Sequence, residues 1–218
     1  MTVFISRREL LKRAGLAGAA AAVVRSDLVV PEASGDVSIQ TTATTASRVA
    51  LENLSAVEAD ILDAIVARLI PADGNGPGAL EAGATHYIDR ALGGALMSSR
   101  EAYHAGLSAL DQYARTARGR RFRELAAAEQ DALLIEVESG TATGFTGGSA
   151  PFFALVRAHT LQGTFCDPFY GGNARFAGWD LIGYPGVRTT VTPDEQRLGA
   201  DVPRNHKGAY DTEMFAKP

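Results

Sequence analysis

The fold class follows from residues 55–71, SAVEADILDAIVARLIP. Apolar residues recur there every three or four positions, which places them on one face of an α-helix. Ser55 and Glu58 have the spacing of a capping box, in which each side chain pairs with a backbone amide at the helix start. Pro71 ends the pattern, because proline cannot continue a helix. The apolar face consists of Ile61, Leu62, Ile65, Val66 and Leu69.

Further helical segments follow along the chain. We predict them from apolar spacing and from start and stop signals, such as the Gly93-Gly94 pair and the well-placed Pro151. These segments are residues 79–92, 99–117, 127–138 and 151–164. Short loops and the lack of a convincing strand pattern predict an all-α fold. We expect an irregular bundle of about five helices with a glycine- and aromatic-rich C-terminal loop segment.

Residues 6–12, SRRELLK, have the pattern of a twin-arginine export signal. The uncharged, alanine-rich run over residues 14–24 is about half the roughly 20 apolar residues that a membrane helix needs. We therefore interpret residues 1–30 as an export signal; a general secretory signal is the alternative. The twin-arginine route carries folded proteins, usually because they or a partner hold a cofactor. The defining residues are Arg7, Arg8, Leu10 and Leu11.

The remaining chain divides into three regions. Residues 31–50 are rich in Ser, Thr and Ala and indicate a flexible linker or arm. A helical domain with the C-terminal aromatic and glycine loop is expected over residues 51–191. Residues 192–218 are polar and indicate an extended C-terminal tail.

Composition and motifs exclude several functions. The net charge of -4, without a basic stripe, offers no electrostatic footprint for nucleic acid. No dinucleotide fingerprint or haem attachment motif occurs, and one cysteine cannot hold an iron-sulfur cluster. We therefore predict no catalytic, cofactor-binding or metal-binding residue in this chain. The histidines are scattered singly, without a zinc-ligand spacing, at positions His86, His104, His159 and His206.

Aromatic residues and glycines alternate near the C-terminus. This stretch is too rich in glycine for a helix and too aromatic for a solvated loop, so it must be buried. It covers either the chain's own core or another protein, because Trp and Tyr are enriched in interfaces. The aromatic residues are Phe165, Phe169, Tyr170, Phe176, Trp179 and Tyr184.

Two motifs in the same region are specific. They read HTLQGTFCDPFYGGN over residues 159–173 and GWDLIGYPG over residues 178–186. LSAVE over residues 54–58 and LIPAD over residues 69–73 accompany them. Together with the export signal, these motifs resemble the gluconate 2-dehydrogenase subunit 3 family, and the likeness covers most of the chain.

The resemblance implies a non-catalytic small subunit of a periplasmic or membrane-associated dehydrogenase for sugars, glycosides or sugar acids. Its catalytic partner would be a separate FAD-dependent flavoprotein of the glucose-methanol-choline (GMC) type, often joined by a cytochrome c subunit with haem c. The small subunit would carry the export signal through the twin-arginine translocase for a catalytic subunit that lacks one. It would also support the folding or flavin loading of that subunit, which explains the missing cofactor motifs.

We predict that part of the C-terminal motif faces the catalytic subunit. The interface residues would be Phe165, Cys166, Asp167, Phe169, Tyr170, Asn173, Trp179 and Tyr184. Cys166 is the only cysteine of a chain expected to be exported, so it forms either a disulfide to the partner or an inert thiol. A free-standing periplasmic binding or chaperone-like module is the alternative function. A self-sufficient enzyme would need a nucleophile-base pair or a metal site, which the sequence does not show.

Overall fold

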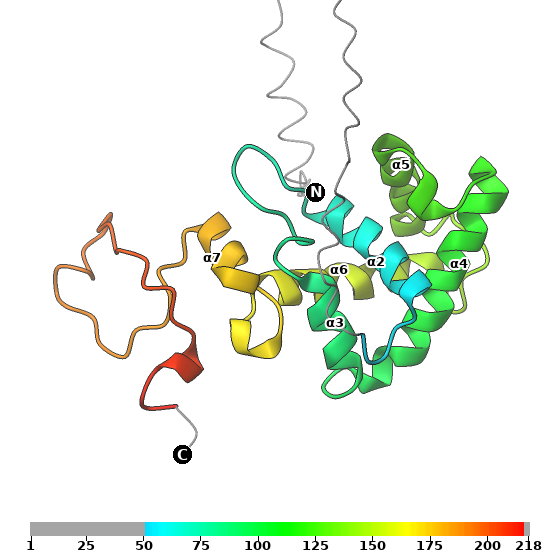
Figure 1. Ribbon diagram of the computed structural model, residues 1–218. Helices are drawn as coiled ribbons and strands as arrows, with labels where there is room; N and C mark the ends of the chain where they lie inside the picture. The colour runs from blue at the N-terminus through cyan, green and yellow to red at the C-terminus, as the bar shows by residue number, and fades with distance from the viewer. Residues whose placement is uncertain (1–50, 216–218) are drawn as a thin grey trace, which may run out of the picture. The chain divides into compact units, whose positions relative to one another are not determined.

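The computed structural model describes residues 51–215, so the predicted export signal and linker lie outside the described residues. The prediction of an all-α bundle is confirmed, since this part of the chain contains helices and turns and no β-strand. Figure 1 shows the arrangement. The helices are α2 (Ala56–Leu69), α3 (Ala84–Leu92), α4 (Arg100–Arg118), α5 (Ala127–Glu138), α6 (Ser149–Phe165) and α7 (Ala177–Ile182).

Helix α2 begins with the predicted capping box. The Ser55 amide donates to Glu58 Oε2 at 2.9 Å, and the Glu58 amide donates to Ser55 Oγ at 3.3 Å. Four of the five predicted apolar residues are buried, and Leu69 is partly buried at the edge of the core. The buried residues are Ile61, Leu62, Ile65 and Val66.

The core lies between helices α2 to α6, each of which contributes buried apolar residues. Helix α6 packs against α3 and α5, while α2 packs against α3 and α4 (Figure 1). Aliphatic side chains and the rings of Tyr103, Phe122 and Phe152 fill the space between them, as apolar burial requires. The largest fully buried side chains include Tyr103, Phe122, Leu62, Ile65, Ile88, Leu92, Leu107, Leu110 and Leu133.

Two sequence predictions about helices are wrong, one about a helix limit and one about a helix that was not expected. Helix α3 begins at Ala84, not at residue 79, because Gly83 adopts a left-handed conformation with φ of 77° and residues 79–83 form turns. The glycine-rich C-terminal stretch was expected to contain no helix, but it includes α7.

Among residues 51–215, no helix is both long and apolar enough to cross a membrane.

A polar pair is buried where α4 meets α6. Tyr103 Oη and His159 Nδ1 lie 3.0 Å apart, and the two rings stack with centroids 5.8 Å apart. Both residues are buried. Burial lowers the pKa of His159, because the charged imidazolium loses its hydration. His159 is therefore neutral in the folded protein at neutral pH and serves as a core hydrogen-bonding residue.

The His159 pKa predicts how stability depends on pH. The unfolded chain binds a proton at His159 near pH 6.5, whereas the folded chain binds it only at a lower pH. The stability that His159 contributes is therefore fully present above about pH 6.5, and it is lost as the pH falls through the folded-state pKa.

Urea unfolding of the wild type and of His159→Asn at pH 7.5, 6.5 and 5.5 checks this expectation. The Asn amide reaches the position of Nδ1 but does not titrate. The stability advantage of the wild type should shrink as the pH falls. An advantage that stays constant or grows would contradict a neutral, buried His159.

Candidate functional site

The C-terminal motif folds back over the end of α6, and three glycines allow close packing, one between α6 and α3 and two between the motif and α6. Gly163 in α6 faces Ala84 and Tyr87 of α3 without an intervening side chain. A methyl group at Gly172 would overlap the Gly163 carbonyl, and one at Gly178 would overlap the Thr164 carbonyl. The motif therefore needs glycine at these positions for contact between backbones, and not only for flexibility.

Asn173 connects the parts of this motif. Its side chain is fully buried, and its Nδ2 donates to the Cys166 carbonyl at 2.8 Å. Its Oδ1 accepts from the amides of Gly178 at 2.8 Å and Trp179 at 3.3 Å. Its own amide donates to the Gly163 carbonyl at 2.8 Å. Asn173 thus pairs with the Gly163 and Cys166 carbonyls at the end of α6 and caps the start of α7.

Trp179 completes this inner layer. The indole Nε1 donates to the Phe165 carbonyl at 2.9 Å, and the residue is buried. The ring contacts Tyr184 edge to face at a centroid distance of 4.7 Å and lies 5.4 Å from the Phe176 ring. A buried indole needs a partner for its N–H group, and Phe165 supplies it.

Three non-glycine residues of this segment, Asn173 among them, adopt left-handed conformations. The φ angles are 45° for Asn173, 55° for Arg175 and 62° for Phe176. Asn tolerates this region, but for larger side chains it costs on the order of 1–3 kcal/mol. The surrounding contacts offset this strain. In this conformation the Phe176 ring packs against Trp179 on one side and stacks on the His206 ring, 5.2 Å away, on the other. Such strain is typical of functional segments.

An outer aromatic cluster, Phe169, Tyr170 and Tyr210, lies on the surface. These side chains are 45%, 50% and 36% exposed. Phe169 stacks on Tyr210 with centroids 3.8 Å apart, and Tyr170 meets Phe169 edge to face at 5.4 Å. Exposed aromatic rings in contact with one another are unusual on the surface of a monomer and are typical of an interaction site.

Asp167 binds the two backbone segments that carry the outer aromatic cluster. Its carboxylate accepts from the Phe169 amide at 3.0 Å and from the Ala209 amide at 2.6 Å. The second contact brings the C-terminal chain, including Tyr210, onto the motif. Asp180 in α7 adds two contacts to the same chain, to Arg204 Nη1 at 3.0 Å and to His206 Nε2 at 2.8 Å.

The structure divides the predicted interface residues into three groups by their exposure. Asn173 and Trp179 are buried within the chain, and their polar groups bind its own backbone. Phe169, Tyr170 and Tyr184 are exposed, and the others are half-buried. Contact with a partner therefore stays a prediction for the exposed rings. Asn173 and Trp179 instead hold the backbone of the same segment through hydrogen bonds. Tyr210, in the C-terminal tail, was not among the predicted interface residues but joins their cluster.

Cys166 is a free, half-buried thiol at the end of α6. Its Sγ lies 3.7 Å from the Gly163 carbonyl and packs against Gly172. Burial raises the pKa of the thiol above its usual value, which slows thiolate chemistry in the isolated chain. A disulfide to a partner stays a prediction.

Three of the four histidines have separate polar partners in the described residues. His104 pairs with Glu58, His159 with Tyr103, and His206 with Asp180. No group of three or more metal-ligating side chains occurs within residues 51–215.

The glycine contacts predict a specific sensitivity. Gly178→Ala should destabilise the protein by about 1–3 kcal/mol, because the new methyl group overlaps the Thr164 carbonyl. Gly94→Ala is the matched control, since nothing lies within 4 Å of that position. The control should change stability by less than about 0.5 kcal/mol. Urea unfolding measures both, and equal stability of the two variants would refute the close packing at Gly178.

Comparison with known proteins identifies the family. The family model for gluconate 2-dehydrogenase subunit 3 matches residues 56–186, more than half of the chain. No curated protein and no solved structure matches the chain significantly. The matched region begins with α2 and ends two residues after Tyr184, so it includes the bundle, Asn173 and most of the exposed rings. The chain therefore belongs to the gluconate 2-dehydrogenase subunit 3 family and is an accessory subunit of a dehydrogenase complex.

Proposed function

We propose that this chain is the non-catalytic small subunit that escorts an FAD-dependent catalytic subunit of the GMC type through the twin-arginine pathway. Family membership supports a dehydrogenase partner. The SRRELLK sequence supports export of a folded complex into the periplasm. The complex would oxidise a hydroxyl group of a sugar, glycoside or sugar acid.

The observation that carries this proposal is the exposed aromatic surface of the C-terminal motif, whose backbone is held by hydrogen bonds and close packing. Phe169 and Tyr170 are half-exposed in a segment held by Asp167, Asn173 and three tightly packed glycines. A surface that is already ordered loses little conformational entropy when a partner binds. Exposed aromatic rings on such a surface are the residue types that contribute most to binding energy.

In the proposed complex, the large subunit performs the chemistry. Its flavin would accept a hydride from the substrate CH–OH group, and the electrons would pass to a cytochrome c subunit or a quinone. The residues of this chain take no part in these steps. Their role is to bind the catalytic subunit, stabilise it and connect it to the export signal.

The alternative is a free-standing periplasmic binding or chaperone-like module. An adjacent reading frame with a dinucleotide fingerprint near its start and no export signal of its own would favour the escort function. Lack of such a neighbour would favour the alternative.

Co-expression tests the escort function. The catalytic subunit is produced with and without this chain, and soluble, flavin-loaded dehydrogenase activity is measured. We expect activity to require the small subunit. Full activity in its absence would contradict an obligatory escort.

The outer aromatic cluster makes a separate prediction. The double substitution Phe169→Ala and Tyr170→Ala should weaken co-purification with the catalytic subunit by at least about tenfold, because interface aromatics often contribute more than 1 kcal/mol each. Ile135→Ala on α5 is the matched control, since this apolar side chain is 53% exposed and lies outside the cluster. Unfolding curves verify that both variants fold. Unchanged recovery of the catalytic subunit with the double variant would exclude this surface as the interface.

A further inference from the structure

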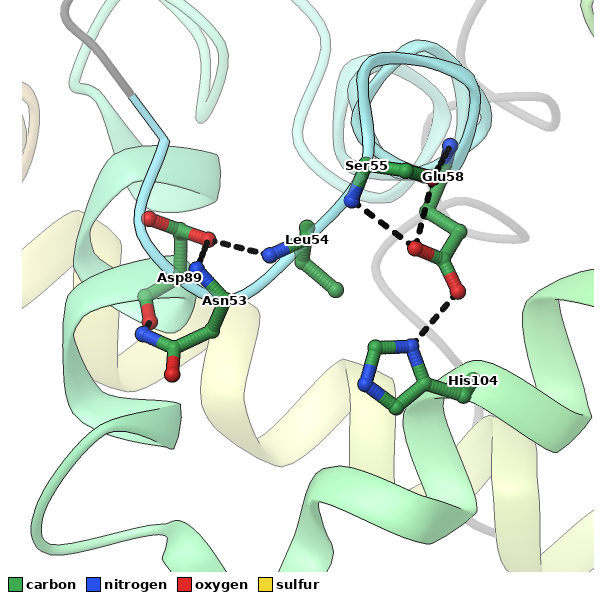
Figure 2. A network of polar contacts seen from close by, with 6 residues as sticks. All are labelled: Asn53, Leu54, Ser55, Glu58, Asp89 and His104. Atoms are coloured by element: carbon green, nitrogen blue, oxygen red, sulfur yellow. Dashed lines mark hydrogen bonds and ion pairs between the residues drawn. The ribbon is translucent and has the colours of Figure 1, made fainter.

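A buried carboxylate holds the chain just before α2. Asp89 in α3 is fully buried, and its Oδ1 accepts from the amides of Asn53 at 3.0 Å and Leu54 at 2.8 Å. Its Oδ2 accepts from the amide of Glu52 at 2.8 Å. Figure 2 shows the Asp89 side chain pointing at this stretch of backbone. Hydrogen bonds from backbone amides to an ionised carboxylate are among the strong ones in proteins.

The same stretch is also tied to α4. Asn53 Nδ2 donates to the Asp89 carbonyl at 2.7 Å, and Asn53 Oδ1 accepts from Arg100 Nη2 at 2.7 Å. Arg100, the first residue of α4, also donates to the Leu92 carbonyl at the end of α3. The Asn53 side chain thus links residues 52–54 to both α3 and α4.

A second contact to α4 lies one turn further along. Glu58, the partner of Ser55 in the capping box, pairs with His104 Nδ1 of α4 at 2.6 Å (Figure 2). Burial raises the pKa of Glu58, but hydrogen bonds from Ser55 and His104 outweigh it, so the pKa is lower than usual. Both ends of the short stretch from Glu52 to Glu58 are therefore fixed to the α3–α4 pair.

These contacts depend on the tertiary fold, because Asp89 belongs to α3 while Arg100 and His104 belong to α4. In an unfolded chain the amides of residues 52–54 bind water, and no local residue replaces Asp89, which lies 35 to 37 positions away in sequence. A buried carboxylate that lost these amides would carry an uncompensated charge. The contacts and the docked helices therefore stabilise each other.

We propose that Asp89 and the amides of residues 52–54 form a latch, which fixes the N-terminal segment to the bundle only when the bundle is folded. This inference rests on the proposed export function for its biological meaning. Residues 1–50 precede the latch in sequence, so a pull on the export signal would reach residues 52–54 before it reaches α2. The latch passes this tension to α3 and α4 and keeps it from unwinding α2.

Hydrogen exchange of the full chain tests the latch. In Asp89→Ala, the amides of residues 52–54 should exchange at least about tenfold faster, since each loses a bond to a charged group. Asp89→Asn keeps one oxygen acceptor, so only part of the protection should be lost. The amides of Leu107 and Leu110 in α4 report global stability. Asp194→Asn, at a 79% exposed carboxylate, is the matched control and should change nothing.

The outcomes separate the latch from the export function. Unchanged exchange at residues 52–54 in both Asp89 variants would overturn the latch. If Asp89→Ala also accelerates exchange at Leu107 and Leu110, it has lowered global stability. The test then rests on Asp89→Asn, where exchange at residues 52–54 should rise while exchange at Leu107 and Leu110 does not. Export is measured as the periplasmic fraction of the full chain. Failure of the wild type to reach the periplasm would refute the export function and leave the exchange result standing. Faster exchange with undiminished export would refute the role of the latch under tension.

Discussion

The buried side-chain amide of Asn173 joins the end of α6 to the start of α7, by donating to the Cys166 carbonyl and accepting from the Gly178 and Trp179 amides. Backbone groups at helix ends need such partners when water is excluded. Without this amide the Gly178 contact with α6 and the burial of Trp179 would lose their support. The rest of the C-terminal surface is built on this junction.

The junction explains how a segment rich in glycine presents a rigid surface. Glycines permit backbone contact on the inner side, and left-handed residues turn the chain so that Phe176 packs against Trp179. The outer side carries Phe169 and Tyr170, which Asp167 orients together with the C-terminal chain. Buried residues thus hold the backbone that carries the exposed rings. This arrangement suits an accessory subunit of a dehydrogenase complex.

Helices with strong local signals could be predicted from the sequence. The α2 capping box and the limits of α5 agree with the structure, because hydrogen bonds within each helix and apolar spacing determine them. Helix α7 could not be predicted, since its cap comes from Asn173, outside the usual capping position. The contact of Tyr210 with Phe169 joins residues far apart in sequence, and the three amides bound by Asp89 leave no local pattern.

Fluorescence of the isolated chain tests most directly whether the C-terminal surface exists before a partner binds. Trp179 is the only tryptophan, so its emission reports on this junction alone. We predict blue-shifted emission and weak quenching by acrylamide in the free subunit, as expected for a buried indole with a bound N–H group. Emission typical of a solvated indole, which shifts only when the catalytic subunit is added, would contradict a surface formed in advance.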